Sequence, residues 1–211
     1  MIRALLASLA LALAFVPAAA GHGGGGDKGY RSTVRLVRPA VPGLQLAILD
    51  SDDRIKATNE SSKAVVIEGY GGEPYIRLSP DGVFENKNSP AVYLNKDRFG
   101  RAQVPSTAKA NAEPDWVKVA DGKAYEWHDH RAHWMSPLAP KPIRDEPDRK
   151  HHVFNWEVPG QAEGKPFVIA GSLDYSPPKK EGAPWLFVIV IGVLLALTLG
   201  GIFALRRLRR A

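Results

Sequence analysis

Residues 125–135, with the sequence YEWHDHRAHWM, bring together residue types suited to binding a metal ion. Three of the six histidines of the chain, His128, His130 and His133, fall within this segment. In an extended strand His128 and His130 project from the same face, because successive side chains alternate between the two faces. Neighbouring imidazoles on one face can share a divalent ion, so the spacing predicts a candidate metal site.

The remaining ligands of this site are open at the level of the sequence. The third ligand comes either from His133 or from a later strand that carries His151 and His152. Imidazoles without thiolates favour copper(II), zinc or nickel, and a thioether at Met135 would add a soft ligand for copper(I). The candidate cofactor is therefore copper or zinc.

Two other interpretations of the same histidines compete with a metal site. Glu126 and Asp129 are carboxylates that could orient metal-bound imidazoles, and they could equally hydrogen-bond to the histidines of a structural or partner-facing cluster. A catalytic cluster is the third interpretation. Because an H-x-H pair has no fixed partner spacing, it is less specific than paired C-x-x-C motifs. The sequence alone favours the structural or partner-facing cluster.

Motifs of the common enzyme classes are absent from the sequence. It contains no G-x-S-x-G elbow, no H-E-x-x-H, no P-loop and no dinucleotide fingerprint. It also contains no cysteine, which excludes a disulfide framework, a thiolate metal site and a cysteine nucleophile. We therefore expect no catalytic activity, with an envelope hydrolase as the remaining enzymatic alternative.

The elements that must position these residues are predicted to be short strands between residues 30 and 175. Turn residues separate runs rich in Val, Ile, Leu and aromatic residues. The predicted strands are residues 34–37, 44–49, 54–58, 64–68, 75–78, 116–119, 124–128, 152–158 and 167–175. Asp121-Gly122 predicts a hairpin between two of them, and residues 101–114 read as a long loop. The pattern predicts an all-β domain, an antiparallel Ig-like β-sandwich.

Two further segments combine Tyr, Gly, Glu, Pro and Asn. They are residues 69–75, GYGGEPY, and residues 88–95, NSPAVYLN. Dense turn chemistry of this kind is typical of loops that carry recognition, and also of stacked turns around buried tyrosine rings. Both interpretations stay open.

The N-terminus reads as a secretory signal peptide over residues 1–20. Arg3 precedes an apolar run, and Ala18 and Ala20 satisfy the small-residue pattern of a cleavage site. Cleavage there leaves Gly21 at the new N-terminus, and cleavage one residue later leaves His22. Residues 21–29 are so rich in glycine that we expect a flexible arm.

The C-terminus reads as a membrane anchor. Residues 176–184 form a proline- and lysine-containing stalk, and residues 185–205 contain no charged residue. A helix of that length rises about 31 Å, enough to cross a bilayer. The arginines of the tail, residues 206–211, place the tail in the cytoplasm and predict a single-pass type I protein of the plasma membrane. Gly192, Ala196 and Gly200 share one helix face, which predicts a homodimer or a membrane-protein partner.

The net charge of +6 reflects this targeting. Of the 28 Lys and Arg residues, Arg3 and the four tail arginines account for five, and neither end contains Asp or Glu. The middle of the chain therefore carries 23 basic residues against all 22 acidic ones. A nearly neutral outer domain gives no support for nucleic acid as a partner.

The layout of the chain, with GYGGEPY, SPAVYLN and YEWHDHRAHWM in that order, resembles bacterial single-pass envelope proteins, a resemblance that brings no activity with it. Residues 153–175, VFNWEVPGQAEGKPFVIAGSLDY, are similar to the closing strand pair of copper-resistance CopC-like sandwiches. That likeness implies an Ig-like fold. The family's copper-binding histidine before a proline is replaced by Lys165 before Pro166, and its N-terminal histidine has a counterpart only in His22. The likeness therefore argues against a copper site at those positions.

Together these features predict a membrane-anchored extracytoplasmic binding or accessory module of the cell envelope. The alternative is extracytoplasmic handling of copper or zinc through His128, His130 and His133.

Overall fold

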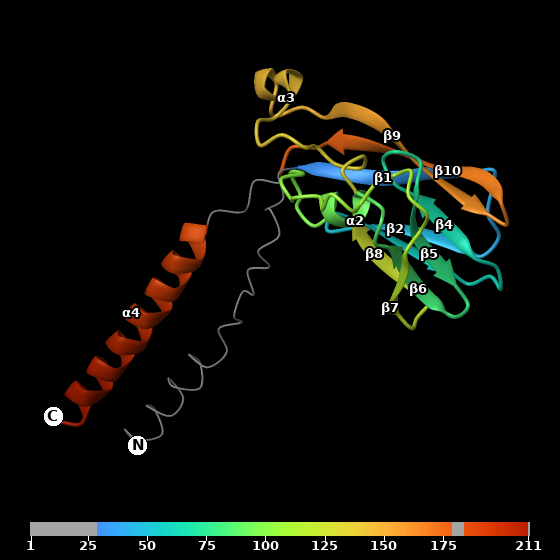
Figure 1. Ribbon diagram of the computed structural model, residues 1–211. Helices are drawn as coiled ribbons and strands as arrows, with labels where there is room; N and C mark the ends of the chain where they lie inside the picture. The colour runs from blue at the N-terminus through green and yellow to red at the C-terminus, as the bar shows by residue number, and fades with distance from the viewer. Residues whose placement is uncertain (1–28, 179–183, 211) are drawn as a thin grey trace. The chain divides into compact units, whose positions relative to one another are not determined.

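The computed structural model describes residues 29–178 and 184–210 (Figure 1). These residues belong to two units, divided between Ser176 and Pro177, and each unit is described by itself. The predicted signal peptide (1–20), the arm (21–29) except for its last residue, the middle of the stalk (176–184) and the final residue of the tail lie outside the described residues.

The first unit consists of two antiparallel sheets. The larger sheet has seven strands in the order β1-β10-β9-β4-β5-β6-β7, and the smaller has three in the order β2-β3-β8. Every hydrogen-bonded pair in these sheets is antiparallel. The strands are β1 Tyr30–Arg38, β2 Leu44–Leu49, β3 Arg54–Asn59, β4 Val65–Glu68, β5 Pro74–Ser79, β6 Gly82–Asn86, β7 Trp116–Ala120, β8 Ala124–His128, β9 His151–Ala162 and β10 Lys165–Tyr175. Two short helices, α2 Ala91–Leu94 and α3 Lys141–Asp145, lie in the connections.

Both sheets contribute to the hydrophobic core. Along β3 the burial alternates, so that Ile55 and Ala57 point inward, as expected for a strand with one buried face. Trp127 of β8 joins them from the same sheet, and Ile76 of β5 and Ile169 of β10 join from the larger sheet. The strand that carries Trp127 also ends in His128, so packing of the core fixes the position of the first candidate ligand.

The hairpin of β9 and β10 packs aromatic rings over glycines. Trp156 pairs with Gly171, and Phe167 pairs with Gly160. A Cβ atom on Gly171 would lie 2.1 Å from the Trp156 ring, and one on Gly160 would lie 2.4 Å from the Phe167 ring. Each ring therefore occupies the space that a side chain on the opposite strand would fill.

Most predicted strands are confirmed, and two details are wrong. No strand was predicted at β6, where Gly82 begins a strand that pairs with β5. The predicted hairpin at Asp121-Gly122 is also wrong. β7 pairs with β6 and β8 pairs with β3, so this turn carries the chain from one sheet to the other.

The second unit contains the helix α4, Pro184–Leu208. Its residues Ile189–Leu208 have a mean hydropathy of 2.3 and are long and apolar enough to cross a membrane. The predicted span, residues 185–205, falls within this helix, and the helix continues through Arg206 and Arg207 of the predicted tail.

We predict that Gly171→Ala destabilises the first unit. The new methyl group would meet the Trp156 ring at 2.1 Å and the backbone oxygen of Thr33 at 2.5 Å, and backbone cannot move aside at low cost. Overpacking of this kind costs about 1–3 kcal/mol in the free energy of unfolding, measured by chemical denaturation of the detergent-solubilised chain.

The matched control is Gly122→Ala. No atom lies within 4 Å of a Cβ atom at that position, and we expect a change within about 0.5 kcal/mol. Equal stability of the two variants would contradict the packing of Trp156 on Gly171.

Candidate metal centre

The three histidines converge because the chain turns at the end of β8. His128 is the last residue of the strand, and the backbone N–H of Ala132 donates to the carbonyl of Asp129 at 3.0 Å. His130 lies within this turn and His133 follows it. One ligand atom from each imidazole lies within 4.8 Å of the others. The turn, rather than an extended strand through His130, brings the rings together.

A buried ion pair holds this turn. The Asp129 carboxylate accepts hydrogen bonds from Arg131 Nε and Nη2, both at 2.8 Å, and from Trp127 Nε1 at 2.9 Å. Burial by itself raises the pKa of Asp129, but the hydrogen bonds from Arg131 hold that pKa below its ordinary value. Arg131 also donates to the carbonyl of Glu68, so the turn is fixed to the end of β4.

Tyr70 connects the turn to the two loops singled out in the sequence. Its hydroxyl accepts a hydrogen bond from the backbone N–H of His130 at 3.0 Å and is paired with Asn95 Oδ1. The Tyr70 ring stacks on the His130 ring, with centroids 5.9 Å apart. Burial raises the pKa of Tyr70, so the phenol stays protonated. Residues 69–75 and 88–95 therefore lie beside the histidines and support them.

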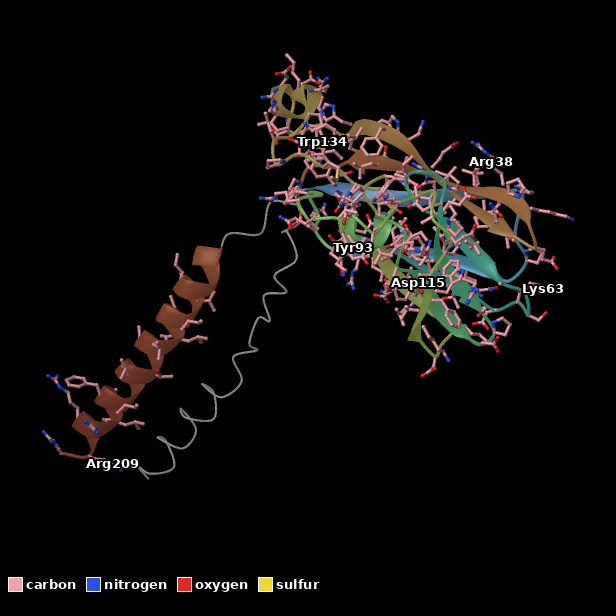
Figure 2. All side chains as sticks on the ribbon, in the orientation of Figure 1. Arg38, Lys63, Tyr93, Asp115, Trp134 and Arg209 are labelled. Atoms are coloured by element: carbon pink, nitrogen blue, oxygen red, sulfur yellow. The ribbon has the colours of Figure 1, made fainter. Side chains whose placement is uncertain are left out.

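Two of the imidazoles are oriented by backbone carbonyls. His130 Nε2 lies 2.7 Å from the carbonyl oxygen of Asp97, and His133 Nδ1 lies 3.1 Å from that of Trp134. Trp134, the neighbour of His133 in the chain, is labelled in Figure 2. A carbonyl oxygen only accepts, so each of these ring nitrogens carries the proton. In the neutral rings the other nitrogens, His130 Nδ1 and His133 Nε2, then have free lone pairs.

The ring of His128 is oriented by Asp53 rather than by a distant carbonyl. Its Nδ1 lies 3.5 Å from Asp53 Oδ1, and the ring also hydrogen-bonds to the backbone of Asp53. Within the described residues, the buried Nε2 atoms of His128 and His133 have no hydrogen-bond partner. Metal-binding histidines are typically held in this way, with one nitrogen on a carbonyl or carboxylate and the other directed at the metal.

The site favours uncharged imidazoles. Only 1% of the surface of His133 and 11% of the side chain of His128 are exposed. Burial lowers the pKa of His133 to about 4 and lowers that of His128 as well. Near neutral pH both rings therefore offer a lone pair to a cation.

Arg98 ties together the loops that hold His128 and His130. Its guanidinium pairs with Asp53 Oδ1 at 2.6 Å and with Asp52 Oδ2 at 2.8 Å. Asp53 contacts His128, and Arg98 is the chain neighbour of Asp97, whose carbonyl holds His130. The two carboxylates offset the positive charge of Arg98 close to a site for a cation.

Of the alternatives for a third ligand, His133 is the one that lies beside His128 and His130. His133 joins His128 and His130, whereas His151 and His152 at the start of β9 have other contacts. His151 Nε2 lies 2.8 Å from the carbonyl oxygen of Glu146, and His152 Nδ1 lies 2.9 Å from Asp174 Oδ1.

Glu126 and Asp129, the carboxylates that the sequence offered as partners of the histidines, have other partners in the structure. Glu126 pairs with Arg54 and Lys56 on the exposed face of the small sheet, and Asp129 faces Arg131. Carbonyls and Asp53 orient the imidazoles instead. Sequence reasoning missed Asp53, Asp97, Arg98 and the role of Tyr70, since only folding brings these residues next to the histidines.

Comparison of the chain with known proteins finds no matching family model, no matching curated protein and no matching solved structure. The function is therefore argued from the geometry of the site.

We predict that buried His133 makes the metal-free protein sensitive to acid. The unfolded chain takes up a proton at this residue near pH 6.5, whereas the folded chain does so only near pH 4. This contribution to stability is fully present above pH 6.5 and is lost as the pH falls towards 4. The shift corresponds to about 3 kcal/mol in the free energy of unfolding, which denaturation in the presence of a chelator at several pH values would measure.

His133→Gln should lose less stability than the wild type over the same pH range, because glutamine does not titrate. The control His151→Gln, outside the cluster, should follow the wild type. Parallel pH profiles for wild type and His133→Gln would contradict the prediction.

Proposed function

We propose that this protein is a membrane-anchored extracytoplasmic module that binds one transition-metal ion, copper or zinc, through His128, His130 and His133. The observation that carries the proposal is the convergence of three ligand nitrogens within 4.8 Å of one another. In the same cluster, the Nε2 atoms of His128 and His133 are buried and lack hydrogen-bond partners within the described part of the chain. Unpartnered buried nitrogens carry a cost in free energy that a bound ion removes.

The donor set selects the class of metal. Imidazole nitrogens suit zinc, copper and nickel, whereas magnesium and calcium prefer oxygen ligands. The neutral rings contribute no negative charge, so the metal ion adds its full charge to the site. Asp52 and Asp53, held by Arg98, supply carboxylates close by.

We propose binding rather than catalysis. The polar group on β9 and β10 does not form the relay of a hydrolase, since Ser172 and His152 each hydrogen-bond to Asp174. A nucleophilic serine requires its histidine within hydrogen-bonding distance, with the acid behind that histidine.

The location is proposed from the two ends of the chain. A signal peptide over residues 1–20 and a stop-transfer helix followed by arginines give a type I protein of the plasma membrane, with the metal site outside the cytoplasm. Two antiparallel sheets around a shared core support an Ig-like sandwich. The face of α4 that carries Gly192, Ala196 and Gly200 is proposed to contact a second copy or a partner helix.

We predict that the detergent-solubilised chain, prepared without a polyhistidine tag, binds about one equivalent of Cu(II) or Zn(II), as expected for a single three-imidazole site. His130→Ala should weaken binding strongly, and the triple change of His128, His130 and His133 to Gln should abolish it. Isothermal titration and metal analysis after dialysis measure both effects.

The matched control changes His151 and His152 to Gln, which removes two histidines outside the cluster. This variant should bind like the wild type. Equal binding by the wild type and the triple variant would disprove the proposal.

We predict that a fluorescent reporter fused after Ala211 is active, because the tail faces the cytoplasm, where the reporter folds. A periplasmic enzyme reporter at the same position should be inactive. The opposite pair of results would overturn the orientation.

A further inference from the structure

Three imidazoles leave one position of a four-coordinate site to be filled. Metals with nitrogen and sulfur ligands are commonly tetrahedral, and a site with three protein ligands takes water or another group in the fourth position. Which group lies next to the free nitrogens therefore decides which metal the site prefers.

Gly100 lies between the His130 ring and the end of the Met135 side chain. Its φ is +67°, and a Cβ atom there would lie 3.6 Å from His130 Nδ1, the lone-pair nitrogen, and 3.4 Å from the Cε methyl of Met135. The lone-pair edge of His130 and the end of the Met135 side chain thus face the same point, which the absent side chain of Gly100 leaves open. The sulfur of Met135 is one bond from that methyl group.

Two carboxylates and a hydroxyl near the histidines have other partners. The Asp53 carboxylate is paired with Arg98, and the Asp97 carboxylate accepts from the backbone N–H groups of Phe99 and Arg101. The Tyr70 hydroxyl is engaged by Asn95 and by the backbone N–H of His130. Met135 has a thioether on an unbranched, flexible side chain, which adapts its position readily.

We propose that the Met135 thioether is the fourth ligand and that the ion is copper, bound as Cu(I). This inference rests on the metal site proposed above and specifies its metal. Thioethers are soft ligands that select Cu(I) and contribute little to zinc binding. The chain contains 2 methionines, Met1 and Met135, so the only methionine outside the signal peptide segment lies two residues after a candidate ligand.

The first experiment compares wild type with Met135→Leu, a change that preserves apolar volume and removes the sulfur. Cu(I) affinity is measured anaerobically by competition with a chromogenic copper(I) chelator, and Zn(II) affinity by competition with a fluorescent zinc chelator. We expect Met135→Leu to lose roughly tenfold or more in Cu(I) affinity, the size typical of losing a supporting group at a metal site, and to keep its Zn(II) affinity. The zinc titration also verifies that the variant is folded.

The second experiment observes the bond directly. Selenomethionine replaces methionine in the full chain, and X-ray absorption at the selenium edge is recorded with one equivalent of Cu(I). We expect copper scattering from the selenium of residue 135 in the wild type and none in the triple histidine variant, which keeps Met135.

The outcomes separate the two proposals. If the wild type binds neither metal, or if it binds no better than the triple histidine variant, the metal site itself is wrong. If the wild type and Met135→Leu bind both metals equally and selenium has no copper neighbour, the histidine site stands and the role of Met135 is disproved, with water as the fourth ligand.

Discussion

The ion pair of Asp129 and Arg131 is the interaction on which the candidate site depends. The Asp129 carboxylate is buried and accepts hydrogen bonds from both Arg131 and Trp127. One carboxylate therefore holds Trp127 of β8 and Arg131 of the turn. Removing one partner of a buried pair leaves an uncompensated charge, which costs about 3–5 kcal/mol. Because the pair lies between His128 and His133 in the chain, its geometry determines the separation of the imidazoles.

The histidines themselves work against stability in the metal-free protein. His133 is almost fully buried, its Nε2 has no hydrogen-bond partner within the described residues, and burial opposes its protonation. The carbonyls of Asp97 and Trp134 each engage one ring nitrogen, which leaves the other nitrogen of His130 and of His133 available as a ligand. This arrangement is costly when empty and favourable with a cation, so metal binding and folding stability should be coupled.

The sequence predicted the features that depend on residues close together in the chain. It did not predict the contacts between residues far apart in the chain. Alternating burial and turn residues located most strands, and an uncharged apolar run located α4. The histidine cluster was found because its members are close in the sequence, and the contact of His133 with His128 depends on a turn of a few residues. The partners of the rings were not predictable, because Asp53, Asp97 and Tyr70 reach the site only through pairing of distant strands and loops. Pairing with distant strands likewise places β7 and β8 in different sheets.

The position of β10 has a mechanical consequence. The last strand of the first unit lies between two neighbours, β1 and β9, and is paired along nearly its whole length with both. A pull applied at the C-terminal end of β10 would therefore load two hydrogen-bond ladders at once, and neither can be peeled away from a free edge. Force that enters the first unit at Tyr175 thus meets a strand supported on both sides, which makes this end of the sheet resistant to unfolding by tension.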